Sequence, residues 1–540
     1  MKNLVRPSAL ILWLAFALTA LTAGASRQAP PAKPDSPQQP PRALTPQERR
    51  GKALYLRGES PTGRELTAVM GEVDVPASTV TCAGCHGARG EGKTEGGVTA
   101  GNLTWANMLK PYGHTHPSGR KHGPFDEASF LRAVVNGIDP DGNTLLVAMP
   151  RYKLSPEEAA DLIAYLKRIE QDQDPGVTDT VVRVGTILPS QGALADAGAA
   201  MREVLNAYFA EVNSRGGVYN RKLELRVADA GAGGPAMSEP ARRLAEQEDV
   251  FAVVGGVTAG ADAEIAALAR QDEIPFIGPA TLTPQSASPA NRYVFYLLPG
   301  LAEQGRALVN FAATKPQLKK ARVLIVRREG EPGRTVAAAV EDQAKQAGWS
   351  NVLTQTYGTA PAAADVAQLV GRLKGNDDDA VFFVGAGGEE AAFIREAAAA
   401  GWTPNVFLVA ALTGRDLLAS VPAAFKDKVF VAFPTVPTDI TPEGLAEFGA
   451  LRDKYKFATR HTASQLAAFA AARIFVEGLR RAGKELSREK LINALEGLYN
   501  YETGVTPPIT FGPNRRIGAA APAILTIDPE KKEFVPVSGR

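Results

Sequence analysis

The sequence predicts a multidomain protein in which a small all-α domain precedes a two-lobed α/β domain. The chain has 540 residues, which is too long for one ordinary hydrophobic core. Residues 45–170 contain three short helical patterns separated by long stretches rich in Gly, Pro, His and Asn. From residue 181 onward, apolar runs typical of strands alternate with amphipathic helical patterns. This alternation indicates parallel sheets covered by helices.

The first 25 residues have the features of an export signal. A positively charged start is followed by an apolar run over residues 9–21, and Ala23-Gly24-Ala25 offers a cleavage site. We therefore expect export to the periplasm with cleavage near Ala25, and an uncleaved membrane anchor is the alternative. Residues 26–44 are rich in Pro, Gln, Ala and Ser, which predicts an extended, disordered tether.

The helices of the small domain are predicted from their ends. Thr45-Pro46-Gln47-Glu48 and Ser155-Pro156-Glu157-Glu158 are both capping boxes with proline at the first helical position. A third helix is expected from about Asp126 to Asn136, because Gly137 is a typical residue after a helix end. Residues 171–180 are polar and contain a Pro-Gly break, which predicts a linker between the two domains.

The chain has two cysteines, Cys82 and Cys85, and His86 follows them directly. Two thiols at this spacing can form thioethers with the vinyl groups of haem, and the next residue then becomes the proximal ligand of the iron. Exported proteins commonly use cysteines in disulfides, so a single closely spaced pair indicates a special use. We expect one covalently attached haem c.

Two alternatives to haem use the same cysteines. One is a thioredoxin-like redox pair, but such a pair belongs at a strand-to-helix turn, and this one lies among loops. The other is a zinc site, which needs two further ligands. The candidates for these ligands are His114, His116 and His122. Their loop, residues 113–122, could instead cover the haem edge, bind a separate metal or supply an alternative axial ligand.

Met149 is the candidate for the sixth ligand of the iron. It lies between Ala148 and Pro150, shortly before the last predicted helix of the domain. The proline fixes the backbone and has no N–H that needs a partner. A thioether ligand favours reduced iron and raises the reduction potential. Core packing is the alternative role for this methionine, as it is for Met108.

Residues 45–169 resemble a class I cytochrome c domain. The matching features are Gly51 and Tyr55 in the first helix, Cys82-x-x-Cys85-His86-Gly87, Met149-Pro150, and LIAYL at 162–166 in the closing helix. The resemblance implies electron transfer through the haem. One departure from the family is the long stretch between Tyr55 and Cys82, where the connection is usually short.

Residues 181–540 resemble the leucine/isoleucine/valine-type solute-binding proteins of ABC importers, also called type I periplasmic binding proteins. The family's segments occur in order: VGTILPSQG at 184–192, NSRGGVYNRK at 213–222, Asp229, the strand at 251–256, IPFIGPATLTP at 274–284, YVF at 293–295 and Gln304-Gly305. The resemblance implies two lobes joined by three crossings, with a ligand between them. We expect lobe 1 at about 181–298 and 436–505, and lobe 2 at about 299–435 and 506–540.

Loops that follow strands are the candidate ligand-binding segments, because ligands of parallel sheets bind beyond the carboxyl ends of strands. By the family pattern, the candidates are Thr258, Ala259, Gly260, Ala280, Thr281, Thr283, Gly387, Gly388, Glu389 and the loop at Leu412-Thr413. The lobe 1 hydroxyl groups could hold the carboxylate of an amino acid, and Glu389 is the obvious candidate for its ammonium group. An ordinary turn or helix cap is the alternative for each candidate.

Three segments depart from the amino-acid-binding members of this family. Tyr296 stands where Arg is frequent, and Phe469-Ala470-Ala471 replaces Tyr-Asp-Ala. Residues 385–388 are Gly-Ala-Gly-Gly, where those members bring an aromatic residue to the ligand. An amide or another small organic solute is therefore a candidate ligand beside an amino acid.

Composition and motifs exclude some classes of function. A net charge of +2 without a basic stripe argues against nucleic-acid binding. The signatures of serine hydrolases, zinc proteases and P-loop proteins are absent from the sequence, and we expect no enzyme. We expect a periplasmic electron-transfer protein that binds a small molecule and has a redox partner such as a dehydrogenase or an oxidase. The alternatives are an ABC importer receptor with a redox-sensing haem and a permease partner, and a haem enzyme that oxidises its ligand.

Overall fold

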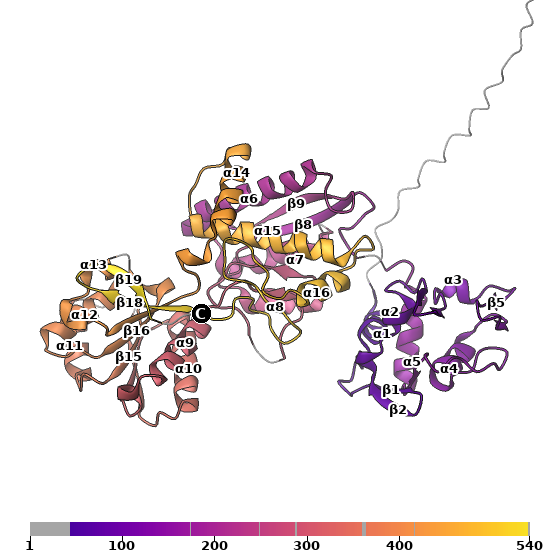
Figure 1. Ribbon diagram of the computed structural model, residues 1–540, viewed down its shortest axis with the longest axis horizontal. Coiled ribbons are helices and arrows are strands. Elements are labelled where there is room, and N and C mark those ends of the chain that lie inside the picture. The colour runs from indigo at the N-terminus through magenta and orange to yellow at the C-terminus, as the bar shows by residue number, and fades with distance from the viewer. Residues whose placement is uncertain are drawn as a thin grey trace, which may run out of the picture.

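The structure is a computed structural model that describes residues 44–172, 174–247, 249–286, 289–358, 363–414 and 416–537. Along these residues lie a small N-terminal domain and two α/β lobes (Figure 1). The predicted export signal, and the predicted tether up to residue 43, lie outside the described residues. Within the described part of the chain, no helix combines the length and the apolar character needed to cross a membrane.

The three predicted helices of the N-terminal domain form, and two short helices that were not predicted lie between the first two of them. Both capping boxes form, and Gly137 ends its helix in the left-handed conformation. The first and last helices cross so closely that a Cβ on Gly51 would lie 1.9 Å from the carbonyl oxygen of Asp161, so only glycine fits there. The helices are α1 (Pro46–Arg57), α2 (Cys82–His86), α3 (Trp105–Met108), α4 (Glu127–Asn136) and α5 (Pro156–Leu166).

The prediction of an all-α N-terminal domain is not confirmed, because short strands lie between these helices. The long stretch after α1 forms a hairpin of β1 and β2, and β1 also pairs with β7. Thr and Val in β1, Thr-Ala-Val-Met, and the two valines in β2, Val-Asp-Val-Pro, have side chains that favour strands. The strands are β1 (Thr67–Met70), β2 (Val73–Pro76), β3 (Lys93–Glu95), β4 (Val98–Ala100), β5 (His114–Thr115), β6 (Lys121–His122) and β7 (Arg151–Tyr152).

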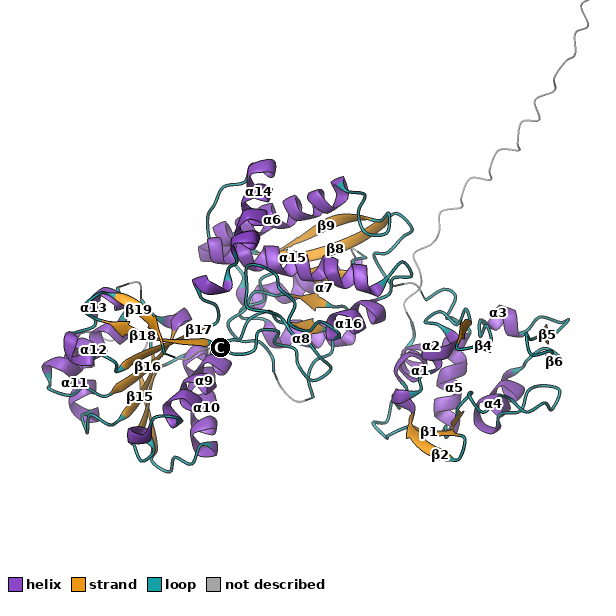
Figure 2. Cartoon of the chain, in the orientation of Figure 1, coloured by secondary structure: helices purple, strands orange, loops and turns teal. Residues whose placement is uncertain are grey.

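Lobe 1 has a parallel sheet in the order β12-β11-β10-β8-β9, covered by helices (Figure 2). Its strands are β8 (Val181–Leu188), β9 (Lys222–Asp229), β10 (Ala252–Val254), β11 (Phe276–Ile277) and β12 (Val294–Phe295). Its helices are α6 (Ala195–Ser214), α7 (Ser238–Gln247), α8 (Asp262–Gln271), α14 (Pro442–Tyr455), α15 (Thr462–Ala482) and α16 (Arg488–Glu496).

Residues 506–519 were expected in lobe 2 but pack against lobe 1. Ile509, Phe511 and Ala519 are buried in the lobe 1 core, and Ile517 forms a parallel bridge with Tyr296. The chain enters lobe 2 for the last time only at about residue 523. The sequence could not place this boundary, because the intervening segment has neither a regular helix nor a regular strand.

Lobe 2 has a mixed sheet in the order β14-β13-β15-β16-β17-β18-β19, with the last two strands antiparallel. Alternate residues of β13 enter two different cores, so helices cover both faces of this sheet. The strands are β13 (Val323–Arg328), β14 (Val352–Tyr357), β15 (Ala380–Val384), β16 (Asn405–Val409), β17 (Val429–Phe433), β18 (Ala523–Asp528) and β19 (Glu533–Pro536). The helices are α9 (Leu301–Ala313), α10 (Glu331–Gln346), α11 (Ala363–Leu373), α12 (Glu389–Ala399) and α13 (Leu417–Ser420).

The carboxyl ends of the lobe 2 strands lie at the end of the lobe that meets lobe 1. The N–H of Leu301, the first residue of α9, donates to the carbonyl oxygen of Leu282 in lobe 1 at 2.8 Å. A helix that leads into a parallel strand runs antiparallel to it, so the N-terminus of α9 and the carboxyl end of β13 share one end of lobe 2. The loops predicted to bind ligand in both lobes therefore lie toward the crossings between the lobes.

The predicted linker at 171–180 makes specific polar contacts with both domains. Lys52 of α1 pairs with Asp172 at 2.8 Å and with Asp174 at 3.8 Å. Asp174 also accepts the backbone N–H of Arg488 in lobe 1 at 2.6 Å. A direct ion pair joins Arg57 to Glu273 of lobe 1 at 3.6 Å. The connection is thus anchored on both sides by ion pairs and hydrogen bonds.

Candidate functional site

The Cys-x-x-Cys-His sequence forms the short helix α2. Thr81 caps this helix by accepting the N–H of Gly84 at 3.2 Å. Cys82 packs against the core of the N-terminal domain, whereas Cys85 is exposed, and both thiols are free. One turn of helix therefore presents two unpaired thiols, one against the core and one at the surface, directly before the histidine.

The His86 side chain is oriented as an iron ligand needs to be. It is 7% exposed, and its Nδ1 lies 2.7 Å from the carbonyl oxygen of Gly101. A carbonyl oxygen can only accept, so Nδ1 carries the proton and Nε2 is left as a free lone-pair donor. A metal-binding histidine is commonly fixed in this way by its other nitrogen. Burial lowers the pKa of His86, which keeps the ring neutral.

The state of Cys82 argues against a thioredoxin-like redox pair. Burial raises the pKa of its thiol to about 11. A redox-active dithiol needs a cysteine whose pKa is lowered, because the thiolate is the reactive form. The zinc alternative also lacks support, because the described residues contain no group of three or more His, Cys, Asp or Glu side chains placed to share a metal ion.

The segment that carries Met149 is hydrogen-bonded to the residues that precede α2. Met149 is half-buried, and β7 begins two residues after it. The Tyr152 hydroxyl in β7 donates to the carbonyl oxygen of Val80, two residues before Cys82. Arg151 holds the preceding loop by donating to the carbonyl oxygen of Met149.

The surface beside Met149 is unusually apolar. In the loop that Arg151 holds, Leu146 is 60% exposed and Val147 is 68% exposed. Two neighbouring apolar side chains at this exposure are available for contact with an apolar group. A porphyrin has a large apolar face, so these residues and the α2 residues fit a haem group.

The three histidines of residues 113–122 form one cluster. The ring of His122 lies between those of His114 and His116, at centroid distances of 5.2 and 5.0 Å, and is tilted against them by 37° and 33°. The guanidinium of Arg120 donates to His116 at 3.0 Å. Burial, with Arg120 nearby, lowers the pKa of His116 to about 4, so this ring is neutral at physiological pH. The Nε2 atoms of His116 and His122 lie 2.9 Å apart, whereas Nε2 of His114 is buried without a hydrogen-bond partner among the described residues.

In lobe 1, the candidate residues meet at the N-terminus of α8. Thr258 is buried, and its N–H donates to the carbonyl oxygen of Ala280 at 3.1 Å, which joins the two candidate loops. The hydroxyl groups of Thr258 and Thr283 each donate to Asp262 at 2.8 Å. The N–H of Gly260 donates to the same carboxylate at 3.4 Å. The sequence did not single out Asp262.

Other lobe 1 candidates form the wall of this arrangement. Thr281 accepts the N–H of Thr283 at 3.0 Å and also hydrogen-bonds to Asp262. Ala259 is half-buried and packs against the lobe 1 core. Three threonine hydroxyls thus converge on one carboxylate beyond the carboxyl ends of β10 and β11.

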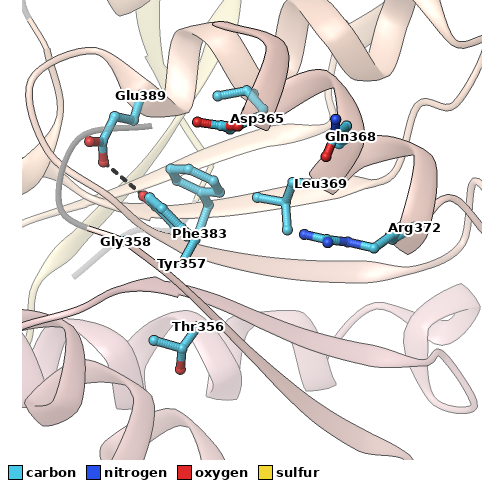
Figure 3. A pocket seen from close by; sticks show the side chains of 10 residues that line it. Thr356, Tyr357, Gly358, Asp365, Gln368, Leu369, Arg372, Phe383 and Glu389 are labelled. Atoms are coloured by element: carbon cyan, nitrogen blue, oxygen red, sulfur yellow. Dashed lines mark hydrogen bonds between the residues drawn. The ribbon is translucent and has the colours of Figure 1, made fainter. Parts of the chain in front are cut away.

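In lobe 2, Glu389 is already paired by its own lobe. The Tyr357 hydroxyl donates to its Oε2 at 2.8 Å, and the N–H of Ala386 donates to the same oxygen at 2.9 Å (Figure 3). Arg328 pairs with Oε1 at 3.5 Å. Glu389 therefore links the loop before α12 to the end of β14, and its charge is balanced by Arg328.

Glu389 borders a pocket of about 500 Å³ at the edge of lobe 2. The pocket lies between the end of β14 and α11, and Asp365, Gln368 and Arg372 project toward it (Figure 3). Its floor is formed by Tyr357 and Phe383, whose rings stack at 5.9 Å. β14 is the edge strand of the lobe 2 sheet. The pocket therefore lies beside the sheet edge and includes residues outside the loops after β15 and β16.

Glu390, the next residue, has one carboxylate oxygen that is hydrogen-bonded and one that has no partner among the described residues. Its side chain is 2% exposed, and its Oε1 accepts the N–H of Gly414 in the loop after β16. Its Oε2 is buried without a hydrogen-bond partner among the described residues. Burial, together with nearby Asp416 and Glu389, raises the pKa of Glu390. The predicted Gly387-Gly388 loop lies beside it, with Gly388 close to the Asp416 carboxylate.

The raised pKa of Glu390 predicts that replacing it with glutamine, its neutral analogue, stabilises the protein in a pH-dependent way. Folding favours the protonated form, so the stability that Glu390 contributes is complete below its ordinary pKa of about 4.3 and is lost as pH rises through the folded pKa. Glu390→Gln stays neutral, and we expect it to melt at a higher temperature than the natural chain at pH 8. The two melting temperatures should converge near pH 4. Glu396→Gln on the same helix is the control and should change neither value.

Comparison with known proteins agrees with this division of the chain. Residues 181–531 match the family model described as periplasmic binding protein, and residues 77–170 match the one described as cytochrome c. The Leu/Ile/Val-binding protein homolog 7 of Brucella abortus is 25% identical over 312 residues, which cover 56% of this chain and 77% of that protein. Homolog 8 of the same organism is 26% identical over 357 residues, covering 62% and 85%.

Solved structures share the two-lobed fold. A branched-chain amino acid ABC transporter protein from Thermus thermophilus with bound valine has a TM-score of 0.52 and 20% identity, covering 66% of this chain and 96% of that one. A possible leucine/isoleucine/valine-binding protein from Rhodopirellula baltica has a TM-score of 0.51 and 21% identity, covering 67% and 97%. The chain therefore belongs to the periplasmic binding protein family, and it carries a cytochrome c domain ahead of the solute-binding lobes.

Proposed function

We propose that this protein is a periplasmic c-type cytochrome that transfers electrons through one covalent haem and captures a small solute between its two lobes. The observation that carries the first part is α2, where two unpaired thiols stand beside a histidine whose Nε2 is left free by the bond to Gly101. The match of residues 181–531 to the periplasmic binding protein family supports the second part and the location.

The chain's own residues would hold the haem as follows. Cys82 and Cys85 attach it, His86 ligates the iron through Nε2, and Met149 is the proposed sixth ligand. When bound, the haem supplies a reversible one-electron couple. Burial of His86 and the Gly101 carbonyl fix the ring before the iron arrives, so little reorganisation accompanies a change of oxidation state. A periplasmic dehydrogenase or oxidase would be the redox partner.

An ABC importer receptor with an accessory haem is the second candidate function. The related proteins named above are solute-binding proteins, and one solved relative contains valine, which favours a receptor that hands its solute to a permease. The anchored connection between the domains is compatible with both functions, since it fixes the cytochrome domain against lobe 1.

The electron-transfer proposal is tested at Met149. We expect Met149→Ala to lower the reduction potential on the order of 100 mV, because axial ligands set haem potentials over roughly 0.8 V. The variant should also lose the sulfur-to-iron charge-transfer band near the red end of the spectrum. Spectroelectrochemistry of the full-length protein measures both properties.

Met70→Ala is the matched control, because Met70 is an exposed methionine of the same domain. It should leave both the potential and the band as they are in the natural chain. If Met149→Ala keeps the potential and the band, the sixth ligand is another residue. A haem that cannot be reduced and reoxidised in the natural protein would overturn the electron-transfer function itself.

A further inference from the structure

The carboxyl end of the lobe 1 sheet holds a carboxylate beside the hydroxyls that were expected to bind one. Asp262 is 7% exposed, and the hydroxyl groups of Thr258 and Thr283 both donate to it. A hydroxyl group has one hydrogen, so these two groups turn only oxygen lone pairs toward a ligand. The N–H of Gly260, which a helix N-terminus would otherwise offer to an anion, also points at Asp262. This surface can accept hydrogen bonds but has few left to donate.

Lobe 2 contains a second hydrogen-bond acceptor, and one of its oxygen atoms has no partner among the described residues. The Oε2 of Glu390 is buried and has no hydrogen-bond partner among the described residues, although a buried carboxylate oxygen normally has one. Its neighbour Asp416 adds a second negative charge, and the backbone at Gly388 lies close to the Asp416 carboxylate. When Glu390 is ionised, a hydrogen-bond donor from outside the lobe would satisfy this oxygen.

Both acceptor sites lie at the carboxyl end of the sheet of their lobe. Asp262 follows β10 at its carboxyl end, and Glu390 follows β15 at its carboxyl end. The contact of Leu301 with Leu282 shows that the carboxyl ends of the lobe 2 strands lie at the crossing with lobe 1. We propose that the interlobe site takes a cationic or neutral nitrogen compound with an N–H group at each end, such as an aliphatic diamine or an amide, and rejects ligands that place a carboxylate on lobe 1.

This inference rests on the proposed solute-binding function and names the class of solute. A ligand carboxylate at lobe 1 would find its hydroxyl donors occupied and would lie beside a like charge in a partly dehydrated site. An ammonium or amide N–H would instead meet the free lone pairs of Asp262, Thr258 and Thr283, and a charge-assisted bond would form. The same groups that would repel an amino acid carboxylate would hold an amine.

The test uses matched pairs of probes with the full-length protein. The first pair is 1,4-diaminobutane and 4-aminobutanoate, and the second is L-leucinamide and L-leucine. We expect the amine or amide member of at least one pair to bind at least tenfold more tightly than its carboxylate partner, measured by calorimetry and by thermal shift. No variant is needed for this comparison, so it holds whether or not a substitution alters folding.

Asp262→Asn then tests the residue itself. The substitution removes the negative charge with little change in side-chain shape. We expect the preference for the amine or amide over the carboxylate to be at least tenfold smaller than in the natural chain. Glu264→Gln is the matched control, because it removes the same charge from the same first turn of α8, at an exposed side chain. The control should keep the full preference.

The results distinguish a wrong ligand class from a failure of the proposed solute-binding function. Equal or tighter binding of the carboxylate members, or a preference unchanged in Asp262→Asn, would overturn the assignment of ligand class while leaving solute binding intact. If neither member of either pair binds at millimolar concentration, the assignment falls together with the proposed solute-binding function.

Discussion

Replacing both Cys82 and Cys85 with serine is expected to give a protein that carries no covalent haem. The two thiols are the cysteines of the chain, and both are unpaired in the structure, so no other residue can form the thioethers. Produced in a host with cytochrome c maturation, the natural chain should keep its haem after denaturation and acid-acetone extraction. The double variant should lose it completely, as judged by haem staining and mass.

The single variants and a control sharpen this result. Cys85→Ser should keep at most one thioether, which shifts the absorption of the reduced haem relative to the natural chain. Thr81→Ser keeps the cap of α2 and both thiols, and it should retain the full haem content. A natural chain that is colourless in the same host would remove the basis of the electron-transfer proposal.

Replacing Arg488 with methionine is expected to destabilise lobe 1 by about 3 kcal/mol, because buried carbonyl acceptors each cost about 1–3 kcal/mol when left unpaired. Arg488 is 8% exposed, and its guanidinium donates to the carbonyl oxygens of Val250 and Phe251 at 2.8 and 2.9 Å. It also donates to the backbone carbonyl oxygen of Asp272 at 2.9 Å. Methionine fills a similar volume and donates to none of them.

Hydrogen exchange of β10 is the measurement, because Val250 and Phe251 lead into that strand. A loss of about 3 kcal/mol corresponds to on the order of a hundredfold faster exchange. Arg480→Met, at an exposed position of α15, is the control and should change exchange little. If β10 exchanges at the natural rate in Arg488→Met, the guanidinium does not stabilise the strand.

The helices of the N-terminal domain could be predicted from sequence because their signals are local. Each capping box lies within four residues, and Gly137 acts at the end of its own helix. The strands β1 and β2 form a local hairpin, but each has only four residues and β2 contains Asp and Pro, so the sequence signal is weak. In addition, β1 pairs with β7, more than eighty residues later. Long-range pairing leaves little trace in a short segment of four residues.

The residues of the candidate site also divide into those with a local sequence signal and those without one. The spacing of Cys82, Cys85 and His86 is local, and the sequence alone identified it. Asp262 and Glu390 were missed because their importance comes from what approaches them in space. An acidic residue at the start of a helix is ordinarily a helix-end charge, and nothing in the sequence shows that three threonine hydroxyls converge on Asp262.

The close crossing of α1 and α5 at Gly51 bears on how such a chain could arise. Because its first and last helices lie against each other, the cytochrome domain starts and finishes at one edge, and a single covalent junction at 171–180 joins it to lobe 1. A unit closed in this way can be added to another gene without opening either hydrophobic core. Only the contacts at the junction are then new, and among them are the ion pairs of Lys52 and Arg57 with acidic residues. Redox and binding units could thus diverge separately while remaining one polypeptide.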